Sequence, residues 1–358
     1  MQTTFLAEGT EIKRVEPLCP VFGICGGCRY QDIPYEDELK IKEALLKNYF
    51  NEQLAVEERV FDPILSSPKP YHYRNRLDVT LLKTKREGIR IGFSPGGALK
   101  VVPVDACPIA QKEISDFLPE LKRQAESKLP PDYRVANLVI KTGDDGRIFW
   151  GGIGKRSLVL KPENYLWTEI EGKRISYSLD TFFQANLSIL PQVVKRIRSL
   201  DSLWSDETIL FDLYGGVGFF GICLADRVKK VVMIEDSVHS LKLARFNLDQ
   251  LGSTNITICP GKVETEFPLW RDHPEYAGSA NKVAFIDPPR AGLSPTVLAA
   301  LTAAKDLKAI LYLSCHPESL IRDLGGFIKE QWEVKRVMPM DFFPKTRHIE
   351  TLVWLKPK

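Results

Sequence analysis

The sequence predicts an α/β protein whose C-terminal half is a doubly wound, mostly parallel, Rossmann-like sheet. From about residue 181, short apolar strands alternate with helical stretches, which is typical of parallel strands joined by crossover helices. The first of these strands leads into a glycine turn and a helix. The tail, residues 332–358, contains two further strands joined by a long connection, and we expect an antiparallel hairpin that closes the edge of the sheet.

Each expected strand of this sheet is a short apolar run bounded by polar, glycine or proline residues. The parallel strands are expected at residues 208–213, 229–235, 255–260, 282–287 and 307–313. Two of the intervening segments, 237–252 and 294–306, have helical patterns. Because parallel strands end on the same edge of a sheet, the residues that follow them should lie together, where ligands bind.

The preceding part of the chain has a different texture. Residues 31–180 begin with an expected helix, 35–50, and continue with short strands and with turns at 94–97 and 143–146, which indicates a smaller α+β middle domain. Residues 1–30 are punctuated by cysteine and glycine and form an N-terminal Cys-cluster module. We therefore expect three parts: residues 1–30, 31–180 and 181–358.

The composition is that of an ordinary globular protein, with 44% hydrophobic and 27% charged residues in 358. The apolar runs are too short to span a bilayer and the N-terminus lacks an apolar signal core, so we expect a cytoplasmic location and no membrane partner. A net charge of +3 gives no global signature of nucleic-acid binding. Any such site must come from local basic clusters such as 73–76 and 195–198. Seven cysteines without an export signal favour metal binding or catalysis over disulfides.

The glycine turn after the first strand, residues 214–218, favours an adenosine-containing cofactor. Its glycines allow close approach of a ligand, and Glu235 at the end of the next strand can accept hydrogen bonds from both hydroxyls of a ribose. A dinucleotide fits this turn poorly, because Asp212, directly before it, would repel a pyrophosphate. S-adenosyl-L-methionine, a sulfonium cation without phosphate, tolerates that carboxylate. The alternative is a structural turn beside a solvated Glu235.

Asp287 ends the fourth strand and should face the same pocket. The motif Asp-Pro-Pro-Arg, residues 287–290, is related to one found in amine methyltransferases of nucleobases, but Arg290 replaces the aromatic residue that stacks the base there. Taken alone, Asp-Pro-Pro can also be a simple strand terminator.

Cys315 ends the fifth strand, so it should lie on the same rim as Glu235 and Asp287. A thiolate there can add to C6 of uracil and so make C5 a nucleophile toward a methyl group. The C5 proton must then be removed, and Glu350, directly before the last strand, can act as the base. The alternatives are a packed thiol and an exposed carboxylate at a strand entry.

The N-terminal cysteines form a second candidate site. Cys19, Cys25 and Cys28 follow a C-x5-C-x2-C pattern, and Cys107 adds a fourth thiol. Four thiolates can bind zinc or an iron-sulfur cluster. Zinc ribbons usually carry two paired C-x2-C knuckles, so this spacing favours the iron-sulfur cluster; purely structural thiols are the third possibility.

These motifs together resemble the uracil-5 RNA methyltransferases, specifically the iron-sulfur branch that forms 5-methyluridine in 23S ribosomal RNA. The resemblance extends over nearly the whole chain. It is carried by residues 19–28, 73–76, 105–110, 182–186, 212–220, 287–293, 313–317 and 343–350. It implies a class I methyltransferase domain, S-adenosyl-L-methionine as methyl donor and RNA as the partner, with no DNA and no membrane. We expect a monomer.

The resemblance also assigns roles to individual residues. Cys19, Cys25, Cys28 and Cys107 match the ligands of a 4Fe-4S cluster. The expected cofactor contacts are Gln184, Tyr214, Glu235 and Asp287, the nucleophile is Cys315 and the general base is Glu350. His316 stands where the family usually has Asn, and we expect a member without the N-terminal RNA-binding barrel, because too few residues precede Cys19.

Three alternative functions differ in what they require of these residues. A tRNA uracil-5 methyltransferase belongs to a branch of the family that lacks the cluster. An exocyclic-amine methyltransferase has no use for Cys315 and Glu350. A non-catalytic RNA-binding relic would keep the cofactor pocket without turnover, and His316 is the feature that best supports it.

Overall fold

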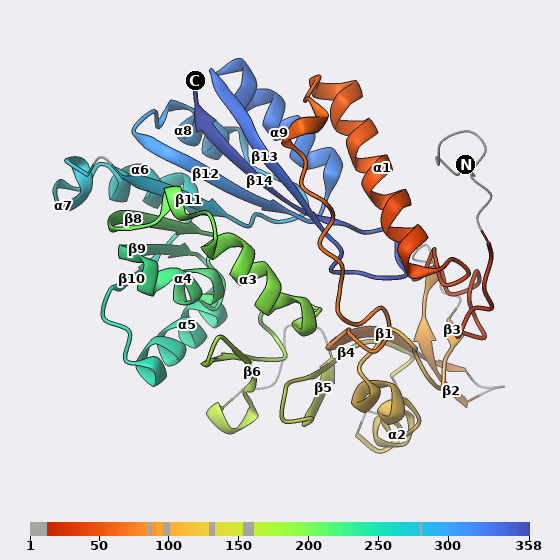
Figure 1. Ribbon diagram of the computed structural model, residues 1–358. Coiled ribbons are helices and arrows are strands. Elements are labelled where there is room, and N and C mark those ends of the chain that lie inside the picture. Colours follow the sequence, from red (N-terminus) through yellow and green to blue (C-terminus); the bar gives the residue numbers. More distant parts are fainter. Residues whose placement is uncertain (1–12, 85–87, 96–100, 129–132, 153–160, 280) are drawn as a thin grey trace.

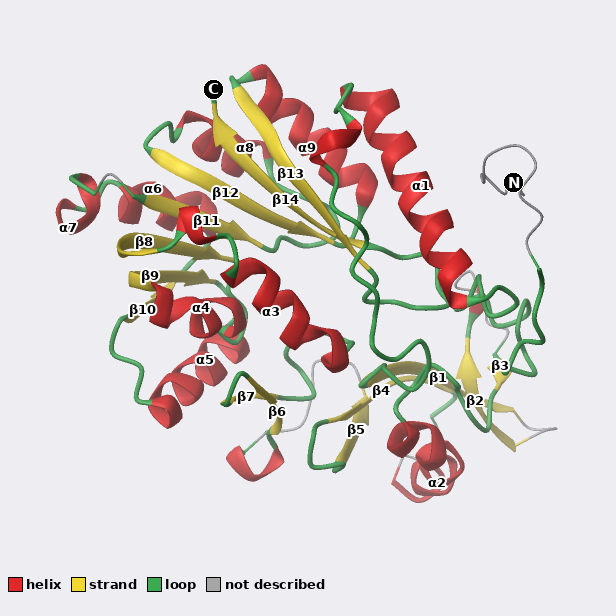
Figure 2. Cartoon of the chain, in the orientation of Figure 1, coloured by secondary structure: helices red, strands yellow, loops and turns green. Residues whose placement is uncertain are grey.

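The computed structural model describes residues 13–84, 88–95, 101–128, 133–152, 161–279 and 281–358. Figures 1 and 2 show a large layered part built on a long twisted sheet, and a smaller part that carries a second sheet and one helix. Among the described residues, no helix has both the length and the apolar character needed to cross a membrane.

The larger sheet confirms the predicted architecture. Its strands are β8 (Ser205–Leu213), β9 (Val228–Glu235), β10 (Ile256–Pro260), β11 (Lys282–Ile286), β12 (Leu307–Ser314), β13 (Trp332–Met340) and β14 (Glu350–Pro357). The order is β10-β9-β8-β11-β12-β14-β13. The first five run parallel, and β14 is antiparallel to both neighbours. The last strand therefore lies inside the sheet, and β13 forms its edge.

Helices cover both faces of this sheet. One face carries α3 (Leu190–Arg198), α4 (Phe219–Leu224) and α5 (Val238–Leu251). The other carries α1 (Tyr35–Leu54), α6 (Val263–Arg271), the short α7 (Pro274–Ala277), α8 (Pro295–Ala303) and α9 (Pro317–Lys329). Successive residues of β8 alternate between the two cores: Leu210 packs in the first, and Ile209 and Phe211 in the second. Burial on both faces explains why the central strands read as continuous apolar runs.

The smaller part is an antiparallel sheet with its own core. Its strands are β1 (Arg76–Thr84), β2 (Gly88–Phe93), β3 (Val102–Pro103), β4 (Val135–Thr142) and β5 (Ile148–Gly152), in the order β3-β2-β1-β4-β5. Helix α2 (Lys112–Lys128) packs on this sheet and contributes Ile114, Leu118 and Leu121 to its core. The predicted turn at 143–146 joins β4 to β5.

Two segments of the expected middle domain contact the larger sheet. The hairpin of β6 (Leu166–Ile170) and β7 (Lys173–Tyr177) packs beside α5, where Asn247 hydrogen-bonds both backbone groups of Ser176. Helix α1 inserts Leu46 and Phe50 into the second core. The domain boundary at residue 181 stays a prediction, but these contacts join its two sides.

Four charged side chains form a buried charge cluster between α1 and the connection from β13 to β14, residues 341–349. Lys42 lies 2.8 Å from Glu38 and 2.8 Å from Asp341, and Lys345 lies 3.2 Å from Glu38. Each residue is at most 3% exposed. Two positive and two negative charges balance here, which is what allows ionised groups to stay away from water. The connection is therefore held against α1 by charge as well as by packing.

Removing one lysine should leave this cluster with unpaired buried charge. We predict that Lys42→Met lowers the free energy of unfolding, measured by guanidinium denaturation, by about 3–5 kcal/mol. The matched control is Lys40→Met on the same helix, because Lys40 is exposed and its ion pair among the described residues is with the nearby Asp37. The stability of this variant should change little. Equal stability of the two variants would contradict the role given to the cluster.

Candidate functional site

The glycine turn after β8 places backbone at the carboxyl edge of the large sheet. Tyr214 begins it with a φ of +62°, a left-handed conformation that is uncommon for a non-glycine residue. Gly215 has no room for a side chain, because a Cβ there would lie 2.6 Å from Met233 Cγ. Gly218, with a φ of +87°, leads into α4. The turn therefore allows the backbone to approach a ligand bound at this edge closely.

Glu235 closes the same turn from the end of β9. Its Oε2 accepts a hydrogen bond from Gly216 N at 2.9 Å, and its Oε1 accepts from Asp236 N at 3.0 Å and Ser237 N at 2.7 Å. Burial raises the pKa of this carboxyl group. Oε2 accepts a single hydrogen bond from the described residues and has a second lone pair for a ligand hydroxyl.

Asp287, at the end of β11, receives Gln184 from the connection between β7 and α3. Gln184 Nε2 donates to Asp287 Oδ2 at 3.2 Å, and Gln184 is 6% exposed. Burial and the charge of Asp212 raise the pKa of Asp287 to about 7. Burial also raises the pKa of Asp212, whose Oδ2 accepts from Gly221 N at 3.0 Å, to about 7. A cationic ligand at this edge would favour the ionised form of both carboxyl groups.

Cys315 and Glu350 lie at the ends of two adjacent strands, β12 and β14, which Figure 1 labels. In the antiparallel pair of β12 and β14, Ser314 lies opposite Thr351, so the next residue of each strand, Cys315 and Glu350, also face each other. Cys315 is half-buried and Glu350 is 6% exposed. Burial, with the charges of Glu350 and Asp287, raises the pKa of the Cys315 thiol to about 12.

Arg290 is the positive group of this edge. Burial and the charge of Asp287 raise the pKa of Glu350 well above its ordinary value, whereas Arg290 acts to lower the pKa of both Glu350 and Cys315. The exposed Arg290 side chain makes no hydrogen bond or ion pair with the described residues. Sequence reasoning missed this role, although the position of Arg290 directly after a strand and two prolines was a usable signal.

The three N-terminal cysteines, Cys19, Cys25 and Cys28, lie near Cys107 of the smaller sheet. Cys28 and Cys107 pack in its core, and the backbone N–H groups of Cys19 and Cys107 donate to side chains at 3.0 Å. Burial raises the pKa of Cys28 to about 12, and the charges of Cys107, Cys25 and Cys19 add to this rise. The thiols are therefore close enough to interact electrostatically. Within the described part of the chain, however, no three His, Cys, Asp or Glu side chains are grouped tightly enough for one metal ion.

Known proteins of similar sequence are RNA methyltransferases. An uncharacterized RNA methyltransferase from Thermosynechococcus vestitus is 30% identical over 96% of this chain and 84% of its own length. Another from Caldanaerobacter subterraneus subsp. tengcongensis is 30% identical over 94% of this chain and 84% of its own length.

A solved structure with the same fold is tRNA (uracil-54, C5)-methyltransferase of Pyrococcus abyssi in complex with S-adenosyl-L-homocysteine. It superposes with a TM-score of 0.68 at 24% identity and covers 91% of this chain and 84% of its own. The expected class I methyltransferase fold is thereby confirmed. Residues 153–358, more than half of the chain, match the family model described as tRNA (Uracil-5-)-methyltransferase. The chain is an RNA methyltransferase and belongs to the tRNA (uracil-5-)-methyltransferase family.

Proposed function

We propose that the chain transfers a methyl group from S-adenosyl-L-methionine to C5 of a uridine in 23S ribosomal RNA, with Cys315 as nucleophile and Glu350 as general base. The observation that carries this proposal is the proximity of Cys315 and Glu350, one position beyond the Ser314–Thr351 pair of β12 and β14, at the edge that also holds Asp287 and the glycine turn. C5 methylation needs a thiolate, a base and a methyl donor in one place. A uridine must leave its stack to reach them.

The residues of the turn suit this methyl donor. S-adenosyl-L-methionine supplies an electrophilic methyl group on a sulfonium cation, which the carboxyl groups of Asp212 and Asp287 favour and a pyrophosphate would not match. Glu235 has a lone pair for a ribose hydroxyl. Gln184 orients Asp287, and Tyr214 starts the turn. The ligand of the Pyrococcus abyssi enzyme supports the same assignment.

The reaction assigns successive steps to the two catalytic residues. Cys315 Sγ forms a bond to C6 of uracil, and the electrons of the C5–C6 bond move to form an enolate through C4. C5 then takes the methyl group as the bond from the methyl carbon to the sulfonium sulfur breaks, which leaves S-adenosyl-L-homocysteine. Glu350 removes the remaining C5 proton, which restores the double bond as the C6–S bond breaks. Arg290, the positive group that acts on both residues, stabilises the thiolate before attack.

The two catalytic residues should fail at different steps. We predict that Cys315→Ala abolishes both 5-methyluridine and the covalent RNA adduct, because no thiolate can attack C6. Glu350→Gln should still attack and accept the methyl group but fail to release the product, so methylated RNA should stay attached to the protein as a slow-migrating band on a denaturing gel.

Cys259→Ala is the matched control, because Cys259 is a buried thiol of the second core at the end of β10. This variant should methylate RNA like the unaltered protein. A Cys315→Ala protein that still forms 5-methyluridine would overturn the proposed mechanism. So would a Glu350→Gln protein that turns over at the normal rate.

We also propose that Cys19, Cys25, Cys28 and Cys107 bind a 4Fe-4S cluster. Support comes from the mutual electrostatic influence of these thiols and from their shared position at the small sheet. In such a cluster each thiolate binds a separate iron, so the four need not be grouped as tightly as the ligands of one ion. The cluster would tie residues 19–28 to the segment that contains Cys107.

Anaerobically purified protein should therefore be brown and contain about four irons per chain. Cys107→Ser should lose most of this iron and lower the midpoint of thermal unfolding, because the link between two distant segments is lost. Cys223→Ser, which alters a buried thiol within α4, should keep its iron. Stoichiometric zinc without iron would contradict the proposal.

The nature of the RNA target is decided by mapping 5-methyluridine in 23S ribosomal RNA and transfer RNA from cells with and without the gene. Loss from 23S ribosomal RNA alone is the expected result, because the four-cysteine pattern resembles the ribosomal branch. Loss from transfer RNA would instead favour the second candidate, which the name of the matching family and the Pyrococcus abyssi enzyme support.

The relic hypothesis predicts no chemistry at all. His316 Nδ1 lies 3.3 Å from Glu318 Oε2, and Glu350 still influences the neighbouring Cys315 electrostatically. RNA containing 5-fluorouridine separates the two hypotheses, because fluorine cannot leave as a proton. An active enzyme should therefore be trapped as a denaturation-resistant adduct, and a binding module should not.

A further inference from the structure

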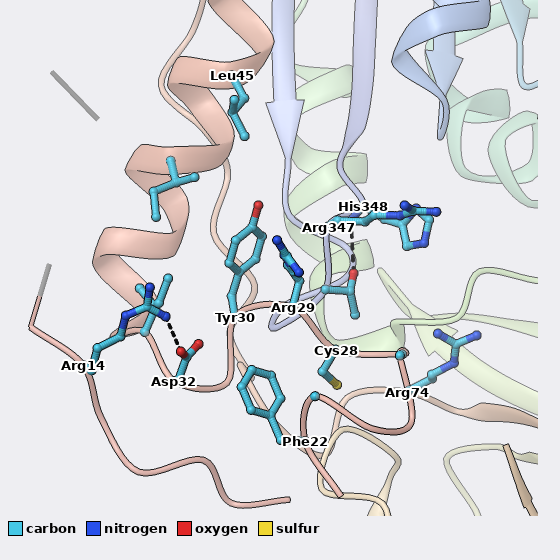
Figure 3. A pocket seen from close by; sticks show the side chains of 16 residues that line it. Arg14, Phe22, Cys28, Arg29, Tyr30, Asp32, Leu45, Arg74, Arg347 and His348 are labelled. Atoms are coloured by element: carbon cyan, nitrogen blue, oxygen red, sulfur yellow. Dashed lines mark hydrogen bonds and ion pairs between the residues drawn. The ribbon is translucent and has the colours of Figure 1, made fainter. Parts of the chain in front are cut away.

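A large cavity lies between the N-terminal module, α1 and the connection from β13 to β14 (Figure 3). Its volume is about 1090 Å³. Residues 22–33 line one side, and Arg347 and His348 line the side nearest to β14. Figure 3 shows Arg29 between Tyr30 and the Arg347–His348 pair.

A second cavity continues the first toward the edge of the large sheet that holds Cys315 and Glu350. It has a volume of about 260 Å³ and shares Tyr30 and Arg347 with the first. Its far end is lined by Pro317, two residues after Cys315, and by Ile349, which precedes Glu350. We call the two cavities together the arginine groove.

The groove carries uncompensated positive charge. Its first cavity is lined by Arg14, Arg29, Arg74 and Arg347, whereas Asp32 is the carboxylate among its lining residues and is already paired with Arg14. The side chains of Arg29 and Arg347 are exposed and make no hydrogen bond or ion pair within the described part of the chain. Two open guanidinium groups are suited to bind phosphates.

Flat side chains lie among these arginines. Tyr30 and Phe22 offer aromatic rings against which a base can stack. His348 lies against Phe343, with ring centroids 6.0 Å apart, and burial together with the charge of Arg290 lowers its pKa to about 4. A neutral imidazole can donate one hydrogen bond and accept another at the edge of a base.

We infer that the arginine groove binds single-stranded RNA nucleotides adjacent to the target uridine, with Arg29 and Arg347 on phosphates and Tyr30 beneath a base. This inference rests on the proposed function, which makes a uridine the target of the reaction. Charge alone would also suit an acidic polypeptide, but aromatic rings and a neutral imidazole recognise bases. A duplex would keep its bases stacked and its backbone outside such a recess.

The test measures binding of a short fluorescent oligouridylate to the full-length protein across a series of salt concentrations. Arg29→Gln and Arg347→Gln should each weaken binding by about tenfold. Each should also reduce the slope of log affinity against log salt concentration by about 0.7, the value for one phosphate contact to a single strand. The control is Arg227→Gln, because Arg227 pairs with Asp201 and precedes β9, at the end of that strand away from Glu235. Its affinity and salt dependence should match those of the unaltered protein.

Several outcomes would overturn the inference: no binding of the oligouridylate, equal binding of both variants and the control, equal affinity for a duplex of the same length, or equally effective competition by polyglutamate. The last would point to an acidic protein partner. Failure of the proposed function looks different. In that case no RNA acquires 5-methyluridine, yet Arg29→Gln and Arg347→Gln still weaken RNA binding.

Discussion

The buried charge cluster fixes the connection on which the catalytic edge depends. Besides its ion pairs, Glu38 Oε1 accepts a hydrogen bond from Lys345 N at 2.6 Å, and Lys345 O accepts from Arg29 N at 2.7 Å and Tyr30 N at 3.0 Å. Lys345 also has a φ of +66°, a strained conformation that persists only because its surroundings hold it. The N-terminal module and α1 thus meet at one residue, which lies in the connection that leads to Glu350 at the start of β14.

At the carboxyl edge of the large sheet, which we call the catalytic edge, the described residues contribute little positive charge. The pKa values of Asp212 and Asp287 are raised to about 7, and the pKa of the Cys315 thiol is raised to about 12. The pKa of Glu350 is raised well above its ordinary value. Arg290 opposes these effects. At neutral pH the thiol is therefore protonated, and the direction of the Glu350 shift opposes its proposed role as a base. A cation brought to Asp287 would lower the pKa of all four groups, so we expect binding of a sulfonium to prepare both catalytic residues.

Much of the large sheet could be predicted because its information is local. Apolar runs, the glycines of the turn and the proline after Cys315 mark strands, turns and helix starts without reference to distant residues. For the same reason the sequence could predict that the carboxyl ends of the parallel strands lie on one edge of the sheet. Gln184, in contrast, was found only through resemblance, because a buried amide between β7 and α3 has no local pattern. The packing of the hairpin β6–β7 on α5 has no local pattern either, because it depends on Asn247, 71 residues from Ser176.

The buried charge cluster was missed for a related reason. On the sequence alone, Glu38 and Lys42 are an ordinary i,i+4 pair on a charged helix and would be expected in solvent. Their burial depends on Asp341 and Lys345, about 300 residues away by their numbering, which no periodic pattern can reveal.

The contacts around Lys345 also link the proposed RNA-binding groove to the proposed catalytic residues. Cys28 lines the first cavity of the arginine groove and directly precedes Arg29 and Tyr30, whose backbone N–H groups donate to Lys345 O. A cofactor bound to Cys28 would therefore hold one wall of the groove and, through Lys345, the connection that ends at Glu350. On this view the proposed cluster needs no redox role to matter. Its loss would loosen RNA binding and the placement of the base together, although it lies outside the methyl-transfer site.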